Sequence, residues 1–209
     1  MKIAVIGAGS VGTTLGRRWA ELGHSVCFGV RDVADAKAKD MVGKIKGNAR
    51  LASVSDAARD AEVVVLATPY AANPAAIAAA GDLSGKILMD VTNPVGPGLT
   101  LTVGFDTSDA EEVAKLAPGA KVYKAMNQVG FDVMANPIFA AGKPVMFVAG
   151  DDAAGKKVVL ELVSALGFEA IDAGELAVAR LLEPFAMLWI HLMARRNLGR
   201  NFAFSLLRR

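Results

Sequence analysis

The stretch Gly7-Ala8-Gly9-Ser10-Val11-Gly12 decides the fold of this chain. It follows Ile3-Ala4-Val5-Ile6, an apolar run typical of a buried parallel strand, and it opens a segment with the apolar spacing of a helix. That spacing places four side chains on one helix face: Val11, Leu15, Trp19 and Leu22. In such a turn the first glycine permits a sharp bend, the second lets a pyrophosphate approach the backbone, and the third lets helix and strand pack closely. The stretch therefore predicts dinucleotide binding at a helix N-terminus, and a glycine-rich turn with no ligand is the alternative.

Segments typical of strands and helices alternate along most of the chain. After the first strand we expect strands at residues 25–30, 62–68, 86–91, 121–125, 144–149 and 168–172. This alternation predicts an α/β fold with a doubly wound parallel sheet of the Rossmann type. Because no repeat or low-complexity linker divides the chain, we expect a single domain over residues 1–209, with C-terminal helices over 175–209.

The connecting segments have less regular patterns. Residues 33–50 are polar and rich in lysine, which favours a helix followed by a loop. Residues 55–60 predict a short helix with Ser55 as its N-cap, and residues 95–108, rich in glycine and proline, predict a loop. We expect the C-terminal helical region to kink at Pro184.

Composition excludes several classes of protein. The 209 residues are 53% hydrophobic and 21% charged with a net charge of +2, and we expect the arginines near the C-terminus to be solvated rather than to form a nucleic-acid surface. The one cysteine, Cys27, lies in an apolar run and predicts a buried thiol without a disulfide. The predicted first strand leaves no room for a signal peptide, and the most apolar stretch, residues 185–194, is about half a membrane span. We expect a cytoplasmic protein that binds neither nucleic acid nor a membrane.

Ligands of a doubly wound sheet bind outside the carboxyl ends of its strands. The residues at those ends should therefore line one cofactor crevice: Gly7 to Gly12, Arg31-Asp32, Ala67-Thr68-Pro69-Tyr70, Asn93-Pro94 and Ala125-Met126-Asn127. We expect the backbone at Thr68 and Pro69 to follow the cofactor's ribose and Tyr70 to cover the nicotinamide. The amides of Asn127 and Gln128 have the chemistry to orient a nicotinamide carboxamide. Ordinary strand-to-helix turns are the alternative at each of these places.

Arg31 indicates which dinucleotide is bound. It follows Gly12 by nineteen residues, where NAD-binding folds place an acid for the ribose 2′-hydroxyl. An arginine there suits the 2′-phosphate of NADP, and Gly29 is expected to leave space for it. Asp32, one residue later, is an acid of the kind that binds the ribose 2′-hydroxyl, so NAD remains the alternative cofactor. Three further basic side chains are candidates for added charge near the adenosine end: Lys44, Lys46 and Arg50.

The sequence contains no evident general acid or base for the oxidation of an alcohol. Of the two histidines, His24 follows a helix and His191 lies inside an apolar helix, where a core or interface position is expected. One cysteine and two distant histidines make no zinc site, so we predict no metal and leave the catalytic residues unassigned. Hydride transfer between a nicotinamide and a flavin-type ring fits this pattern, because the conjugated acceptor ring takes up the charge itself.

Several stretches together resemble one enzyme family. They are Lys2-Ile3-Ala4-Val5-Ile6 with the glycine turn, Gly29-Val30-Arg31-Asp32, Asp90-Val91-Thr92-Asn93-Pro94, Lys124-Ala125-Met126-Asn127, Asp172-Ala173-Gly174-Glu175-Leu176 and Arg180-Leu181-Leu182-Glu183-Pro184. Over nearly its whole length the chain resembles the NADPH:8-hydroxy-5-deazaflavin (coenzyme F-420) oxidoreductases and the soluble NADPH-oxidising part of the STEAP-type metalloreductases. The deazaflavin enzymes usually carry a histidine where this chain has Asn127, which makes it more similar to the bacterial and metalloreductase branches.

The resemblance implies a small dimeric Rossmann enzyme with NADP along the glycine turn. It implies that Arg31 holds the 2′-phosphate and that residues 125–127 adjoin the nicotinamide. Residues 204–207 are implied to shape the pocket of a second ring, a deazaflavin or flavin co-substrate. The C-terminal helix also has a broad apolar face that must be buried, in a homodimer or within one subunit. Its residues are Leu181, Leu182, Phe185, Leu188, Trp189, Leu192 and Met193.

Three functions follow from these observations. The first is an NADPH-dependent oxidoreductase that transfers hydride between NADP(H) and a small-molecule redox acceptor, a deazaflavin or a flavin, with ferric reduction through the flavin as a variant. The second is an imine or hydroxy-acid reductase, which would need a separate helical catalytic domain, although only residues 175–209 follow the last predicted strand. The third is a protein that senses NADP without turnover.

Overall fold

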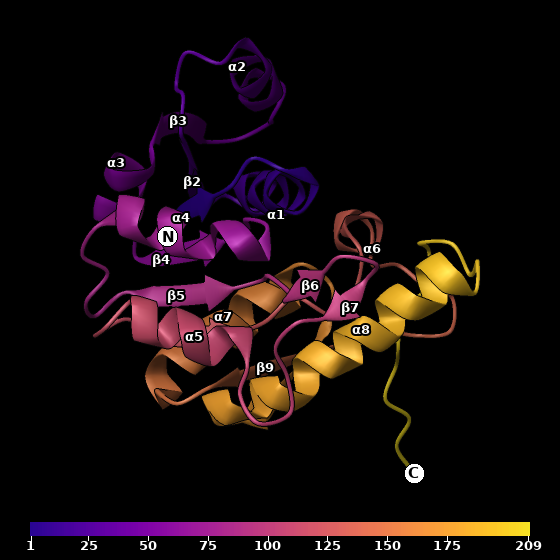
Figure 1. Ribbon diagram of the computed structural model, residues 1–209. Helices are drawn as coiled ribbons and strands as arrows, with labels where there is room; N and C mark the ends of the chain where they lie inside the picture. The colour runs from indigo at the N-terminus through magenta and orange to yellow at the C-terminus, as the bar shows by residue number, and fades with distance from the viewer.

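The structure, a computed structural model, describes residues 1–209 and has an eight-stranded sheet at its centre (Figure 1). The strands lie in the order β10-β9-β8-β5-β4-β1-β2-β3. Their bounds are β1 Lys2–Ile6, β2 Ser25–Val30, β3 Ala49–Ser53, β4 Val63–Leu66, β5 Ile87–Asp90, β8 Lys121–Lys124, β9 Val145–Gly150 and β10 Glu169–Gly174. From β3 to β8 the neighbouring strands are parallel, and β1, at the point where the order reverses, is buried except at its first residue. The predicted Rossmann-type α/β fold is confirmed.

Strands β9 and β10 run antiparallel to the rest of the sheet, so the predicted parallel, doubly wound sheet is mostly parallel and differs from the prediction only at this edge. β9 pairs antiparallel with β8, and β10 pairs parallel with β9. The reason lies in the connection, because β8 and β9 are joined through α6 (Phe131–Ala135), only five residues long. Without a crossover helix the chain does not return to the opposite edge before pairing again. As a result β9 begins at the same edge where the parallel strands end.

Helices cover both faces of the sheet and create two apolar cores. Helices α1 (Ser10–Glu21), α6 and α7 (Ala153–Ala165) enclose a core that contains Trp19 and Phe28. Helices α3 (Val54–Arg59), α4 (Asn73–Ala80) and α5 (Asp109–Leu116) enclose the other core, around residues such as Ile77 and Val113. The remaining elements are α2 (Ala36–Gly43), α8 (Ala179–Arg195), the short 3-10 helices η1 (Tyr70–Ala72) and η2 (Leu176–Val178), and a hairpin of β6 (Val95–Gly96) with β7 (Thr100–Leu101).

Two local predictions in the first half of the chain are corrected. Residues 33–50 contain α2 as expected, but the loop after it is followed by β3, an edge strand that is only partly buried and therefore lacks a clear apolar pattern. The N-cap of α3 is Ser53 rather than Ser55, because the Ser53 hydroxyl accepts a hydrogen bond from the backbone N–H of Asp56 at 3.1 Å.

The C-terminal region holds one long helix rather than several. α8 runs through Pro184 to Arg195, and residues 196–209 are not helical, with Asn197 and Gly199 at positive φ. With η2 it spans Leu176–Arg195, 20 residues that contain an 18-residue window of mean hydropathy 1.4, which by length and composition suffices to cross a membrane and exceeds the predicted stretch. A helix of a soluble core passes the same test, and α8 packs here against α5 and β7 and runs diagonally across the lower right of Figure 1.

Candidate functional site

The three glycines of the turn after β1 have different surroundings. Gly7 has φ +108°, and a Cβ there would lie 2.5 Å from the Ala67 carbonyl oxygen. A Cβ on Gly12 would overlap the carbonyl oxygen of Gly7. A Cβ on Gly9 would meet no atom within 4 Å. Gly7 and Gly12 are therefore required by the turn itself, whereas Gly9 faces open space where a ligand can approach the backbone.

Helix α1 begins at this open space without any side-chain cap. Its N-cap is Gly9, whose carbonyl accepts the N–H of Thr13 at 2.9 Å. The backbone N–H groups of Ser10, Val11 and Gly12 donate to no acceptor within the protein. Exposed N–H groups at the positive end of a helix form an anion site, which is what the predicted pyrophosphate contact requires.

Arg31 and Asp32 follow β2 and differ in what they bind. The Arg31 side chain is exposed and has no ion-pair partner. The Asp32 carboxylate accepts the backbone N–H of Ala34 at 2.8 Å and so closes a local turn. This leaves the guanidinium as the free group and favours the NADP interpretation. Gly29 does not provide ligand space as predicted, because a Cβ there would lie 3.2 Å from the Cα of Val54, against α3.

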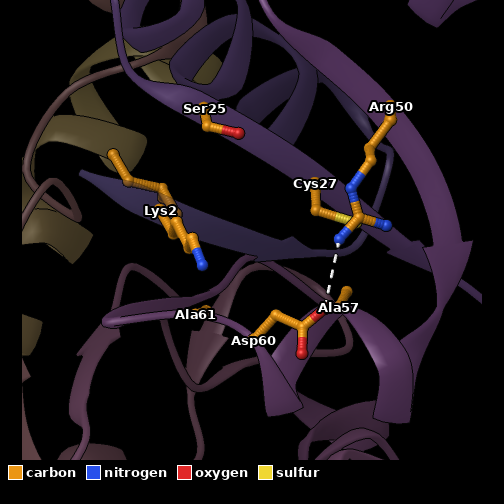
Figure 2. A pocket seen from close by; sticks show the side chains of 8 residues that line it. Lys2, Ser25, Cys27, Arg50, Ala57, Asp60 and Ala61 are labelled. Carbon is orange, nitrogen blue, oxygen red and sulfur yellow. Dashed lines mark ion pairs between the residues drawn. The ribbon is translucent and has the colours of Figure 1, made fainter.

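The three other basic residues lie at the wrong edge of the sheet. Figure 2 shows Arg50 in a pocket of about 170 Å³ together with Lys2 and Ser25, which begin β1 and β2. Arg50 lies 3.6 Å from Asp60 there, at the amino edge and opposite the glycine turn. Lys44 pairs with Asp40 at 2.5 Å, and both Lys44 and Lys46 lie on the connection that enters the amino end of β3. The prediction that these residues add charge near the adenosine is wrong.

The segment after β4 is tied to two helices by its side chains. The Thr68 hydroxyl donates to the Asn73 side-chain oxygen at 2.7 Å. The Tyr70 hydroxyl donates to the Glu112 carboxylate of α5 at 3.0 Å, and burial together with Glu112 raises the pKa of Tyr70 to about 12. Ala67 and Pro69 contribute backbone, since the Ala67 N–H donates to Ile6 at 2.9 Å. Thr68 therefore lies beside the glycine turn, and the cover of a nicotinamide by Tyr70 stays a prediction.

The amides of Asn93, Asn127 and Gln128 bind one another. The Asn93 amide donates to the Asn127 carbonyl at 2.8 Å, and the Asn127 amide donates to the Asn93 side chain at 3.0 Å and to the Leu182 carbonyl at 3.3 Å. Gln128 donates to the Asn127 side chain and to the Phe147 carbonyl. All amide hydrogens of Asn127 and Gln128 are used inside the protein, which corrects the expectation that they orient a carboxamide.

The backbone at the same two strand ends has a defined conformation. The carbonyl of Pro94 accepts from the N–H of Thr102 at 2.9 Å, so this segment is held by the loop that carries the β6–β7 hairpin. Met126 follows Ala125 with φ +57°, a left-handed conformation that is uncommon outside glycine. Contact of residues 125–127 with a cofactor stays a prediction, and it would involve the main chain because the Asn127 amide hydrogens are used inside the protein.

Sequence reasoning missed a buried charged cluster directly beneath this edge. The Lys124 ammonium, at the end of β8, lies 2.6 Å from the Asp90 carboxylate, 2.9 Å from Glu183 and 3.7 Å from Asp109. All four side chains are at most 1% exposed. The Glu183 carboxylate also accepts the backbone N–H groups of Asp109 and Ala110 at the start of α5. The three acids surround the ammonium, which supplies the cation of this cluster. The sequence did contain a signal for these buried charges, because Asp90 and Lys124 end apolar strands and Glu183 interrupts an apolar helix face.

A proton count indicates that this hydrogen-bond arrangement is the one formed when Asp109 is protonated, below its pKa. The Thr92 hydroxyl lies within hydrogen-bond distance of both the Asp90 and the Asp109 carboxyl groups, yet it has one hydrogen to donate. Asp90 is stabilised as an anion by Lys124 and by the N–H of Thr92, so Asp109 is the group that carries the second proton. Burial, then the charge of Asp90, raises the pKa of Asp109 to about 6. Burial also raises the pKa of Glu183. Burial lowers the pKa of Lys124, but the surrounding carboxylates raise it by more, so the net change is upward.

Aromatic side chains gather where β9 begins. Phe204 packs on Phe185 with ring centroids 4.7 Å apart, and its carbonyl accepts the N–H of Val145 at 2.9 Å. Phe202 stacks on Trp189 at 5.0 Å. The C-terminal segment is thus fixed near Phe147, to which Gln128 is bonded. A pocket for a second ring at residues 204–207 stays a prediction.

His191 is exposed and not in the core, and Leu22, expected on the buried face of α1, is 47% exposed.

The fold and the open glycine turn define an NADP-dependent oxidoreductase of the Rossmann class, and the comparisons with known proteins agree. Residues 2–94 match the family model "NADP oxidoreductase coenzyme F420-dependent". The chain is 34% identical to the F420-dependent NADP reductase of Methanothermobacter thermautotrophicus, over 95% of this chain and 93% of that protein. It therefore belongs to the F420-dependent NADP reductase family.

Other relatives extend the comparison. A structure from Arthrobacter sp. FB24 that carries a provisional F420-dependent NADP-reductase name is 38% identical, covers both chains fully and has a TM-score of 0.91. Metalloreductase STEAP3 of Rattus norvegicus is 30% identical, but the match covers 36% of that protein. A reductive aminase from Aspergillus terreus shares the fold at 22% identity and a TM-score of 0.70, and this chain covers 63% of its length.

Proposed function

We propose that this protein transfers hydride between NADP(H) and a deazaflavin of the coenzyme F420 type, and that flavins serve as weaker acceptors, with ferric reduction through a flavin. One observation supports this most directly. The space at Gly9, bordered by unpaired N–H groups of α1 and followed at the next strand by the free Arg31 guanidinium, suits a dinucleotide with a 2′-phosphate.

The hydride step itself requires the two rings to be stacked and oriented. When bound, NADPH would supply a hydride with its electron pair and be left as cationic NADP⁺, and the acceptor ring would take up that hydride together with one proton from water. We assign no acid or base to this step. Residues 7–12 bind the pyrophosphate, Arg31 binds the 2′-phosphate, and the main chain at residues 67–69, 93–94 and 125–127 borders the nicotinamide half.

The experiment is anaerobic oxidation of NADPH by the purified protein, with the deazaflavin, FMN, FAD and a ferric chelate as parallel acceptors and NADH as the control donor. Rapid oxidation with the deazaflavin supports the proposal. Turnover only with flavin or iron would move the protein to a metalloreductase-like activity. Binding of NADPH with no turnover on any acceptor would favour a sensor of NADP.

Reduction of an imine, or of an oxo acid to a hydroxy acid, is the second candidate. It is favoured only by the shared fold of the reductive aminases, whose chains are longer than this one. Residues 175–209 form one helix and an irregular segment, and not the separate helical domain that such a site would need. Turnover of a cyclic imine with NADPH, in the absence of any flavin, would support this candidate instead.

We also propose a soluble, cytoplasmic homodimer. Within one chain, Leu182 and Trp189 on α8 are buried, but Leu181 and Leu188 remain 67% and 47% exposed. Phe105, beside Leu181 in a shallow groove, is 72% exposed. A two-fold interface over α8 would cover these side chains. Light scattering coupled to gel filtration gives the mass directly, and a monomer at micromolar concentration would contradict the proposal.

A further inference from the structure

The buried charged cluster lies where the proposed function places the nicotinamide half of the cofactor. Asp90 and Lys124 are the last residues of β5 and β8, and Thr68 follows β4, so the cluster is beneath the carboxyl edge. A hydrogen-bond path connects Thr68 with the cluster. The Thr68 hydroxyl donates to Asn73, and the Asn73 amide donates to Thr92 and to Asp109. The Thr68 hydroxyl therefore donates its hydrogen toward the cluster, and its oxygen lone pairs can accept a hydrogen bond from a donor on the cofactor.

The cluster has more negative than positive charge. Lys124 is its only cation, and Asp90 and Glu183 are carboxylates that bind this ammonium. With Asp109 protonated the cluster has a net charge of −1, and with Asp109 ionised the net charge is −2. The N–H groups at the start of α5 offset part of the Glu183 charge. The other charged side chains nearby, Glu112 and Glu111, are bound to Tyr70 and Arg180 at the partly buried side of α5.

Charge in a sealed site acts strongly on a neighbouring group. The side chains of Asp90, Asp109, Lys124 and Glu183 are excluded from water, so solvent and salt screen them little. The two forms of the cofactor differ in charge at one place only, since the nicotinamide ring is cationic in NADP⁺ and neutral in NADPH. An excess of buried negative charge under the ring therefore favours NADP⁺ over NADPH.

We propose that this cluster sets the relative affinity for oxidised and reduced nicotinamide, and that Asp109 is the positioning residue that adjusts it by gaining or losing a proton. The inference rests on the proposed function. Asp109 does not contact the cofactor. It acts through the field at the ring and through Asn73 and Thr68. Its ionised form therefore strengthens the preference for NADP⁺ over NADPH, and its protonated form weakens that preference.

The test measures the dissociation constants of NADP⁺ and NADPH by fluorescence titration at pH 5.5 to 8.5, for the unmodified protein and Asp109→Asn. The asparagine resembles the protonated acid in shape and donates to Thr92, but it cannot ionise. In the unmodified protein, the preference for NADP⁺ over NADPH is expected to rise on the order of tenfold with pH, the effect of one added buried charge. In Asp109→Asn the preference is expected to stay at its low-pH value.

Two features of the design isolate the effect. The 2′-phosphate titrates near pH 6, but it is common to both forms and cancels in the ratio of their affinities. Asp60→Asn removes an acid at the opposite edge of the sheet and should reproduce the unmodified protein at every pH. A ratio that does not change with pH in the unmodified protein, or an equal change in Asp109→Asn, overturns the inference while the proposed function stands. Failure of both forms to bind at any pH overturns both.

Discussion

Replacement of Asp109 by asparagine should change the pH dependence of folding stability. Asp109 is 1% exposed, and its pKa of about 6 lies above the ordinary value of 3.8. A carboxyl group whose pKa is raised in the folded state binds its proton more tightly there than in the unfolded chain. Its contribution to stability is therefore complete at low pH and is lost as pH rises from about 3.8 through about 6. An asparagine side chain at this position cannot titrate and has no such loss.

The magnitude follows from the two pKa values. Each pKa unit corresponds to about 1.4 kcal/mol, so the whole titration is worth about 3 kcal/mol. About 2 kcal/mol of this falls between pH 4 and pH 7.5, where the free energy of unfolding is readily measured. Relative to the unmodified protein, Asp109→Asn should gain this amount across that interval.

Urea denaturation followed by circular dichroism at a series of pH values measures this difference. The comparison between the two proteins removes the titration of all other groups, because they are common to both. Asp60→Asn is the matched control, and its difference from the unmodified protein should stay constant over the same interval. A constant difference for Asp109→Asn would refute the proton assignment in the buried cluster.

Three further substitutions test other parts of the structure. Gly9→Val should leave the melting temperature nearly unchanged and abolish binding of both NADPH and NADH. Gly12→Val should lower the melting temperature, because its side chain overlaps the Gly7 carbonyl. Equal melting temperatures of the two variants would contradict the assigned surroundings of the two glycines. Arg31→Ala should weaken NADPH binding by tenfold or more, about 1.5–3 kcal/mol, and leave NADH binding nearly unchanged, and equal losses in a titration of both would exclude a contact to the 2′-phosphate. Lys124→Met should lower the free energy of unfolding at pH 7 by about 3–5 kcal/mol, because it leaves the buried carboxylates without a cation. Urea denaturation measures this loss, and a loss below about 1 kcal/mol would show that the buried carboxyl groups are protonated instead.

The parts of the fold that depend on local pattern were predictable. The glycine turn, the apolar run before it and the helix after it are adjacent in the sequence, and the Rossmann sheet follows from the alternation of strand and helix patterns along the chain. The direction of β9 was not predictable from its own residues, because it depends on how far the chain travels after β8. Strand β3 was missed because an edge strand buries few side chains and has no apolar period to detect.

The candidate site was predictable to the same extent. The strand ends were located correctly by topology, but which polar atoms stay free depends on contacts between distant residues. Asn127 bonds to Asn93 and to Leu182, and these partners only become neighbours after folding. The buried cluster similarly joins Asp90, Lys124 and Glu183 from three separate elements. Sequence patterns identify the residue types, and the fold decides which of them remain available to a ligand.

The position of Glu183 has a consequence for where this chain can be divided. Glu183 lies on α8, yet its carboxylate binds Lys124 at the carboxyl end of β8 and the first N–H groups of α5. A chain that ended before α8 would leave Lys124 with fewer anionic partners and the start of α5 without acceptors, in addition to exposing the surface that Leu182 and Trp189 cover. We therefore expect the nucleotide-binding half to depend on α8 for its stability, and its loss of structure on heating should coincide with that of α8 in one cooperative transition.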